Sequence, residues 1–409
     1  MASFFPKNSV SRREILKQAL GLSVASTTLG VFSQSNVFAS NPTVLTSGYI
    51  PILDCAPLIV AYEKGFLKDN GIKAERPVLI RTWPALMEAF AAKQILLTHI
   101  LLPQVMFLRY AQKLPVRSVA FNHLDTISMV RAKEIVRTID LGGKTVACPT
   151  WWSPHNALFQ ELLRKEGLKP VVGKSESSLA PNEVAFKVVA PPDMIDALKT
   201  GKIAAFVVSE PFGAAAEVLA GATIMKMGGD IWCNNPCCQS VLLQETIDKD
   251  RSWSQAVINA LYKAASWAHQ NKQELASILG KDGGGYFPMP TKIVERALLK
   301  DDLHTYGPEG TGAIMHTDWN VHRVEFNPYP YESAFDVMLD LMKRTVVDQS
   351  AALPDQLRKL SGREIAHEIV DYDLAQAAFK NIDGIKTFGL DNKRPFIRKE
   401  RYEILLKKA

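Results

Sequence analysis

The chain has 409 residues, of which 47% are hydrophobic and 22% are charged, and its formal net charge is +6. Residues 1–39 hold four basic side chains and one acidic side chain, so the remaining residues carry a net charge of only +3. A charge this small and evenly mixed gives no reason to expect a nucleic-acid partner, and about 370 residues are enough for two domains. The five cysteines are an odd number, which excludes a fold stabilised mainly by disulfides.

An export signal is predicted over residues 1–39. Arg12 and Arg13 lie in a basic segment, and an uncharged, mostly apolar run follows from Gln18 to Val37, before small residues that suit a signal peptidase. The paired arginines favour a twin-arginine signal and a periplasmic protein. An uncleaved membrane anchor is the alternative, because the apolar run approaches the length of a membrane span. No cysteine lies near the predicted cleavage site, so a lipoprotein is not expected.

The first predicted elements are a strand over residues 44–52 and a helix that begins near Pro57. Asp54 lies between them, at a sheet edge where helix N–H groups can face a ligand. Three roles stay open for Asp54: a helix N-cap, a solute contact or a calcium ligand. A second strand is expected after the turn at Asn70-Gly71.

Strands and helices continue to alternate through the first half of the chain. Helix 85–93 follows Trp83-Pro84, strand 96–101 follows that helix, and another helix begins at residue 102. This alternation predicts an α/β fold with parallel strands. His99 lies inside the apolar strand, where a core or hinge role is favoured over a ligand contact.

The stretch from Val188 to Phe212 predicts one complete strand–helix–strand unit. Asp193 is predicted to cap the helix and Gly201 to end it. The two strands should be parallel, with a right-handed crossover. The second strand stops at Ser209-Glu210-Pro211, so both strand ends fall where open α/β sheets bind solutes.

Later segments indicate the domain organisation. Residues 141–147 are predicted to begin a second lobe, and residues 230–239 to return to the first. Helical periodicity is visible over residues 254–279 and 333–341. The Lys- and Arg-rich tail, residues 391–409, is predicted to be a solvated terminal helix rather than a binding patch.

Five segments resemble, in the same order, parts of the periplasmic substrate-binding proteins of nitrate, bicarbonate and sulfonate ABC transporters. The segments are GYIPILDCAPLIVAYEKGFLKDNGI, RTWPALMEAFAAK, THILLPQVMFLRYA, VVAPPDMIDALKTGKIAAFVVSEPF and YPYESAFDVMLDLMKRT. The resemblance implies an α/β, type II periplasmic binding protein, whose two lobes close on a solute in the cleft between them. It implies lobe one over residues 43–130 and 240–345, lobe two over residues 131–239, and a C-terminal helical extension over residues 346–409.

The resemblance also implies ligand-binding residues. Trp83 stands where a nitrate-binding relative has the tryptophan of its cleft, and its indole N–H can donate to an oxyanion. Thr126 lies near a polar contact of such relatives, His155 matches a pocket histidine, and Glu210 belongs to a Glu-Pro corner. Structural alternatives stay open: packing for Trp83, a satisfied core histidine for His155, and a link between crossing strands for Glu210.

One departure from the family lies at the return crossing, where relatives carry a lysine after a proline and this chain reads Asn235-Pro236-Cys237-Cys238. Without that cation, a bound anion has to be neutralised by backbone N–H groups, Trp83 or His155. Cys238 is included among the candidate ligand-binding residues. Together with Cys233 and Cys237 it could bind a soft metal or form a disulfide, but a buried thiol turn is favoured, and no metal or cofactor is predicted.

The leading hypothesis is the solute-binding component of an ABC importer, which binds a small anion and delivers it to a permease and ATPase complex. Nitrate is expected first, then bicarbonate, cyanate or an organosulfonate, and the protein is expected to be a monomer and not an enzyme. A binder of thiamine-pyrimidine-like or aromatic solutes is the second hypothesis, since Trp151 and Trp152 could stack on a ring. A thiamine pyrimidine synthase-like enzyme is the third, although residues 54–57 lack the histidine that those enzymes consume, and no catalytic residue is predicted.

Overall fold

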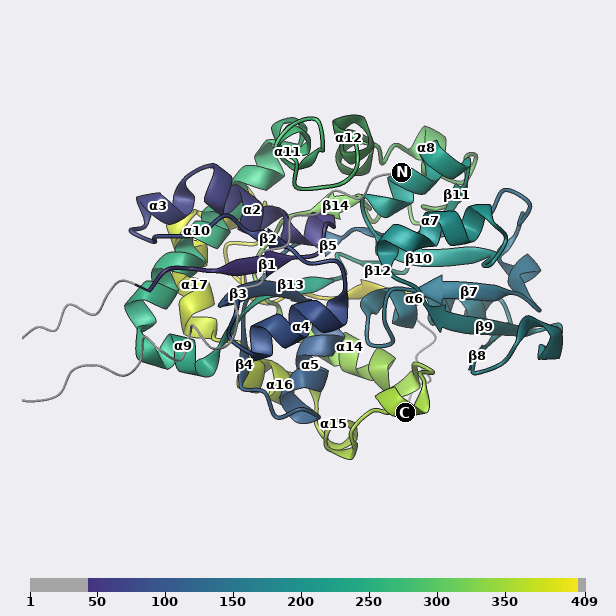
Figure 1. The fold of residues 1–409 in the computed structure, drawn as a ribbon, viewed down its shortest axis with the longest axis horizontal. Helices are drawn as coiled ribbons and strands as arrows, with labels where there is room; N and C mark the ends of the chain where they lie inside the picture. The colour runs from purple at the N-terminus through teal and green to yellow at the C-terminus, as the bar shows by residue number, and fades with distance from the viewer. Residues whose placement is uncertain (1–42, 404–409) are drawn as a thin grey trace, which may run out of the picture. The chain divides into compact units, whose positions relative to one another are not determined.

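A five-stranded sheet takes strands from distant parts of the chain. Its strands are β1 (Ser47–Tyr49), β2 (Val78–Leu79), β3 (Leu97–Leu101), β4 (Val116–Phe121) and β13 (Cys238–Leu243). They lie in the order β2-β1-β3-β13-β4 (Figure 1). The computed structural model describes residues 43–403, so the export signal predicted over residues 1–39 lies outside the described residues.

A second sheet has six strands in the order β11-β6-β10-β7-β9-β8. They are β6 (Ile127–Arg131), β7 (Thr145–Cys148), β8 (Lys169–Val172), β9 (Glu183–Val188), β10 (Ala205–Ser209) and β11 (Thr223–Met227). β6 runs antiparallel to β10 and β11, and β13 runs antiparallel to β3 and β4. The prediction of parallel strands is therefore wrong for β6 and β13, because the chain reaches both through short crossings without an intervening helix.

The unit predicted over residues 188–212 forms β9, α7 (Pro191–Lys199) and β10. β7 pairs in parallel with β9 and with β10, so the predicted parallel direction is confirmed. Gly201 follows the helix with a left-handed φ of 69°. The predicted cap at Asp193 is wrong, because Ala190 is the N-cap and the two prolines start the helix earlier.

Helices cover both sheets. The helices that pack around the first sheet are α2 (Ala56–Glu63), α3 (Phe66–Asp69), α4 (Trp83–Ala91), α5 (Leu102–Tyr110), α9 (Gln244–Lys249), α10 (Arg251–Gln270) and α11 (Lys272–Leu279). The second sheet carries α6 (Pro154–Lys165), α7 and α8 (Phe212–Ala220). α12 (Thr291–Leu299) contacts both α8 and α11, and α13 (Leu303–Tyr306) follows it in the chain. Among the helices of residues 43–403, none combines the length and hydrophobicity that a membrane crossing needs.

Within residues 43–403, the chain has three short segments that lie between the two sheets. It leaves β4 at Phe121 and enters β6 at Ile127, so it crosses before the segment 141–147 predicted for this step. It returns through β12 (Trp232–Cys233) into β13, within the predicted region. In the third segment, β14 (Val324–Glu325) pairs antiparallel with β5 (Leu124–Asp125) in a short ribbon. The lobe boundaries themselves stay a prediction.

Glu325 lies in this ribbon, and we expect its carboxylate to make the free energy of unfolding depend on pH. His269 Nδ1 lies 2.6 Å and Lys272 Nζ 2.8 Å from its carboxylate, and Asp125 and His322 are also near enough to interact with its charge. Burial opposes ionisation, yet the two basic partners lower the pKa of Glu325 to about 2. A lowered pKa stabilises the fold above the unfolded value of about 4.5, and this contribution disappears as the pH falls toward 2.

Glu325→Gln should therefore lower the free energy of unfolding by on the order of 2 kcal/mol at pH 7, and by much less at pH 3. Urea unfolding at the two pH values measures this difference. The exposed Glu309→Gln change is the control and should have little effect at either pH. An equal loss at pH 7 and pH 3 would contradict the electrostatic explanation.

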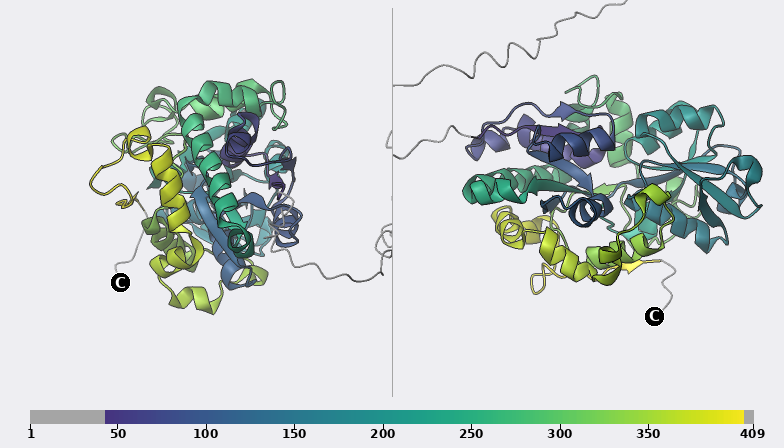
Figure 2. Two further views of the ribbon diagram at one scale, coloured as in Figure 1. Left: turned by 90° about the vertical axis from the view of Figure 1, so that its left-hand side faces the viewer. Right: turned by 60° about the horizontal axis from the view of Figure 1, so that its bottom comes forward.

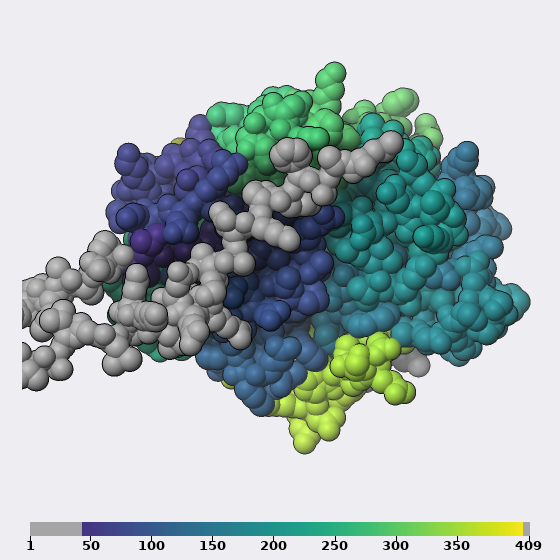
Figure 3. Space-filling model, viewed as in Figure 1, coloured from purple at the N-terminus to yellow at the C-terminus, as the bar shows by residue number. Residues whose placement is uncertain are grey.

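The C-terminal region packs against the first sheet. Its helices are α14 (Glu332–Arg344), α15 (Asp355–Lys359), α16 (Gly362–Ile369), α17 (Tyr372–Asn381) and α18 (Gly384–Thr387). α17 lies beside α10, as the yellow and green helices show in the left view of Figure 2, and α16 packs on α14. The yellow-green segment around α15 is exposed on the face shown in Figure 3.

The terminal helix predicted within residues 391–409 is wrong for the described part of that segment. Residues 391–403 are extended or turned, and β15 (Arg401–Tyr402) pairs antiparallel with β12. Glu400 accepts hydrogen bonds from Trp232 Nε1 at 2.7 Å and from Ser333 Oγ at 2.6 Å. These contacts with residues far back in the sequence hold the tail extended.

Candidate functional site

A cluster of buried polar side chains lies where strands of both sheets end. This buried polar cluster consists of Asp54, His99, His123, Ser209, Cys237 and Cys238. Asp54 follows β1, His99 lies within β3 and His123 follows β4, all in the first sheet, whereas Ser209 ends β10 of the second. The cluster therefore connects the two sheets at the position where the sequence predicts a solute.

Asp54 is the centre of the cluster. Ser209 Oγ donates a hydrogen bond to Asp54 Oδ2 over 2.5 Å, and His123 Nε2 lies 2.8 Å from Asp54 Oδ1. Burial opposes the ionisation of Asp54, but the charge of His123 outweighs burial and holds the pKa of Asp54 well below its usual range. The N-cap role for Asp54 is wrong, because it caps neither the short 3₁₀ turn η1 (Leu53–Cys55) nor α2.

His123 supplies the positive charge of the cluster. Burial acts against a charged imidazole, yet Asp54 raises the pKa of His123 to about 10, so the two form a buried ion pair at neutral pH. Thr126 Oγ1 lies 3.1 Å from His123 Nδ1 and 3.1 Å from Ser209 Oγ. Thr126 has a left-handed φ of 66°, which β-branched residues rarely adopt. The backbone of the first crossing is thus strained where Thr126 joins the cluster.

Trp83 and His99 present two N–H groups that meet no acceptor within residues 43–403. His99 Nε2 accepts a hydrogen bond from Ile50 N–H over 3.0 Å, and burial lowers the pKa of His99 to about 4. The imidazole is therefore neutral and carries its proton on Nδ1. The rings of Trp83 and His99 are neighbours, with centroids 5.8 Å apart in an edge-to-face arrangement.

Further buried polar atoms near this region have no hydrogen-bond partner in the part of the chain that the structure describes. They are Trp152 Nε1, His155 Nδ1 and both amide atoms of Gln239. Leaving one buried polar group unpaired costs about 1–3 kcal/mol. Native proteins keep such groups few, so this concentration indicates a site that a bound solute or ion completes.

Cys237 connects His155 to the cluster, with its Sγ 3.7 Å from His155 Nε2. Burial would raise the pKa of Cys237, but a hydrogen bond from Cys238 and the nearby histidines lower it to about 6. Burial and the neighbouring Cys237 raise the pKa of Cys238 well above its ordinary value. All five cysteines lie within residues 43–403 and are free thiols, so the disulfide alternative at this turn is not formed.

Two overlapping sets of side chains in the cluster have donor atoms suited to a metal ion. One is Asp54, His123 and Cys237, and the other is Asp54, His99 and Cys238. Within each set the donor atoms lie within 4.8 Å of one another, and all the side chains are buried. The sequence spreads these residues over almost two hundred positions, which is why no metal was predicted.

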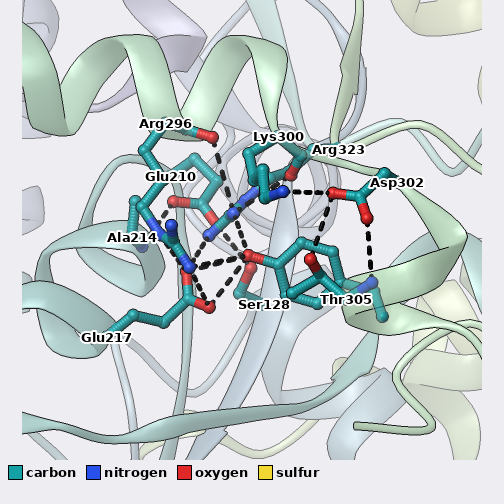
Figure 4. A network of polar contacts seen from close by, with 10 residues as sticks. Ser128, Glu210, Ala214, Glu217, Arg296, Lys300, Asp302, Thr305 and Arg323 are labelled. Carbon is teal, nitrogen blue, oxygen red and sulfur yellow. Dashed lines mark hydrogen bonds and ion pairs between the residues drawn. The ribbon is translucent and has the colours of Figure 1, made fainter. Parts of the chain in front are cut away.

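The environment of Glu210 differs from that of the other predicted ligand-binding residues. Its Oε1 accepts hydrogen bonds from Ser128 Oγ at 2.5 Å and from Arg323 Nε at 2.8 Å, and its Oε2 accepts one from Ala214 N–H. Arg323 also reaches Glu217 and is almost completely buried (Figure 4). Both carboxylate oxygens are thus occupied within the protein, which favours a role in holding the crossings together.

The structure brings most of the predicted site residues together. Asp54 and Cys238 belong to the cluster, Thr126 touches it through His123 and Ser209, His155 through Cys237, and Trp83 through His99. Contact of any of them with a solute stays a prediction. Sequence reasoning missed His123, although the polar pair Asn122-His123 directly after an apolar strand could have indicated a strand end facing a site.

Comparison with known proteins gives a consistent result. The model of the NMT1-like family matches residues 39–280. The nitrate import ATP-binding protein NrtC of Synechocystis is 26% identical over 305 residues, covering 71% of this chain but only 44% of that protein, so the chain spans less than half of this relative. The nitrate/nitrite binding protein NrtA of Nostoc is 24% identical over 336 residues, covering 73% of this chain and 71% of the relative.

The fold has close counterparts among solved structures. The periplasmic nitrate-binding protein NrtA from Synechocystis superposes with a TM-score of 0.68 at 17% identity, covering 86% of this chain and 92% of that chain. The alkanesulfonate-binding protein SsuA from Xanthomonas axonopodis superposes with a TM-score of 0.53 at 18% identity, covering 75% of this chain and 93% of that chain. These matches confirm the predicted α/β fold of a periplasmic binding protein.

Proposed function

The chain belongs to the NMT1-like family, and on this premise we propose that it is the solute-binding component of an ABC importer for a small oxyanion, with nitrate first. The solute binds between the two sheets and is delivered to a membrane permease and its ATPase. The named relatives, which include a nitrate/nitrite binding protein and a nitrate import ATP-binding protein, support a nitrate-type system. The protein acts in the periplasm as a free monomer after twin-arginine export, and it binds without turnover.

One observation carries the choice of an anion: Trp83 Nε1 and His99 Nδ1 are neighbouring buried N–H donors that find no acceptor among the described residues. An oxyanion offers several acceptor oxygens and would satisfy both groups at once. The N–H of His99 is fixed on this side, because Ile50 occupies the other ring nitrogen. A cation or an apolar ring would leave these two donors unpaired.

The charges of the cluster favour an anion of charge −1. Asp54 and His123 neutralise one another, and Arg323 is already engaged by Glu210 and Glu217. The site therefore offers N–H dipoles and little net positive charge, which suits nitrate, bicarbonate, cyanate or a sulfonate better than a divalent anion. This arrangement replaces the lysine that nitrate-binding relatives carry at the return crossing.

Trp83→Phe tests the proposal, because it removes the indole N–H and keeps an aromatic ring. Isothermal titration of ligand-stripped protein with nitrate should give one site per chain, and the variant should bind about tenfold more weakly or worse, since hydrogen bonds to charged groups contribute about 1.5–3 kcal/mol. Trp253→Phe, on α10, is the matched control and should bind as the parent does.

The other three anions are titrated in the same way. Binding of one of them in place of nitrate, with the same loss in Trp83→Phe, would keep the proposal and change the solute. Failure of all four anions to bind, or equal affinity in Trp83→Phe and the parent, would overturn it.

A further inference from the structure

The buried polar cluster contains one carboxylate, one imidazole and one thiol that face each other from three distant segments. Asp54 follows β1, His123 follows β4, and Cys237 precedes β13. Their donor atoms lie within 4.8 Å of one another, and all three side chains are buried. Oxygen, nitrogen and sulfur donors in this combination are ligands of borderline transition metals, Zn²⁺ above all.

Two distances show that the donor atoms are close enough to share one ion. Asp54 Oδ1 lies 2.8 Å from His123 Nε2, so the carboxylate and the imidazole already face each other. Cys237 Sγ lies 3.7 Å from His155 Nε2, which is long for a hydrogen bond. Sulfur and nitrogen ligands of one tetrahedral zinc ion are about 3.5 Å apart, given bond lengths of about 2.3 and 2.0 Å.

The hydrogen bond to His99 decides between the two overlapping donor sets. Ile50 N–H already occupies His99 Nε2, so the neutral ring carries its proton on Nδ1 and has no free lone pair for a metal. The set of Asp54, His99 and Cys238 is therefore incomplete. In the other set, no backbone group among the described residues occupies either nitrogen of His123, and the side chains beside it are Thr126, Asp54 and Cys237.

We propose that Asp54, His123 and Cys237 bind one Zn²⁺-class ion, with His155 beside Cys237 at the remaining coordination position. Binding displaces the proton that His123 directs toward Asp54, Cys237 coordinates as the thiolate, and no electron is transferred. The three proposed ligands do not include the Trp83 and His99 donors, so the inference does not depend on which solute the protein binds.

The test is a titration of the full-length, reduced, metal-free protein with Zn²⁺, followed by native mass spectrometry and calorimetry. One ion should bind per chain. Cys237→Ser and His123→Gln should each weaken binding at least tenfold, while Cys148→Ala, another buried cysteine on β7, should leave it unchanged. Thermal unfolding of each variant without metal shows whether it is folded.

Co²⁺ provides a second readout that does not depend on affinity. A thiolate-to-cobalt charge-transfer band should appear in the parent protein and in Cys148→Ala, and it should disappear in Cys237→Ser. Zn²⁺ binding that survives Cys237→Ser, or that is lost in Cys238→Ala and not in Cys237→Ser, would overturn the assignment. Absence of any bound ion in the parent would also overturn it, whatever the outcome of the nitrate titration.

Discussion

Replacing Arg323 by Met should lower the free energy of unfolding by about 3–5 kcal/mol, because removal of one partner of a buried ion pair leaves the other charge unpaired. Arg323 Nε donates to Glu210 over 2.8 Å, and its Nη2 lies 3.1 Å from Glu217. Its Nη1 also donates to Tyr306 Oη and to the carbonyl of Lys300. The side chain is 1% exposed, so water cannot replace these partners.

A double variant separates electrostatics from packing. Glu210→Gln combined with Arg323→Met removes the unpaired charge at Glu210, so it should recover part of the stability lost in the single variant. Arg363→Met is the control, because the Arg363 side chain is 72% exposed beside Glu332 and should contribute less than about 1 kcal/mol. Urea unfolding measures all four proteins. A loss below about 1 kcal/mol in Arg323→Met would contradict the role assigned to this network.

Gly362→Ala should destabilise the protein by on the order of 3 kcal/mol through direct overlap with backbone. Gly362 begins α16, and a Cβ added there would lie 2.2 Å from Asp336 N and 2.3 Å from Phe335 C, both in α14. Backbone atoms inside a helix cannot rotate aside as a side chain does. Relief would require α16 to move away from α14, and with it the C-terminal region that packs on the first sheet.

The matched control for this prediction is Gly389→Ala. Gly389 has a left-handed φ of 60°, and no atom of the described part of the chain lies within 4 Å of an added Cβ, so its substitution should cost about 1 kcal/mol through backbone strain alone. Urea unfolding gives the two losses, and hydrogen exchange of α16 shows whether the damage in Gly362→Ala is local. Equal losses in the two variants would contradict steric overlap as the cause.

The amino-acid sequence determined the elements whose signals are local. The unit over residues 188–212 was predictable because two apolar runs enclose a short amphipathic helix, and burial of Met194, Ile195 and Leu198 reports that face directly. Asp54 was predictable as a site candidate because it follows a strand, and in an α/β fold the strand ends meet at one edge, whereas Trp83 and His155 were named from the family resemblance.

Only the tertiary structure decided which of these residues act together. Asp54 meets Ser209 across 155 positions of sequence, and Cys237 meets His155 across 82, so no periodicity in the sequence records either contact. The same reason explains why the tail is extended rather than helical: its lysines and arginines suit a solvated helix, but β12 supplies a strand partner from far back in the chain. The periodicity of the sequence indicates which side chains are buried. Which partner a buried charged side chain meets depends on how the segments between the two sheets fold.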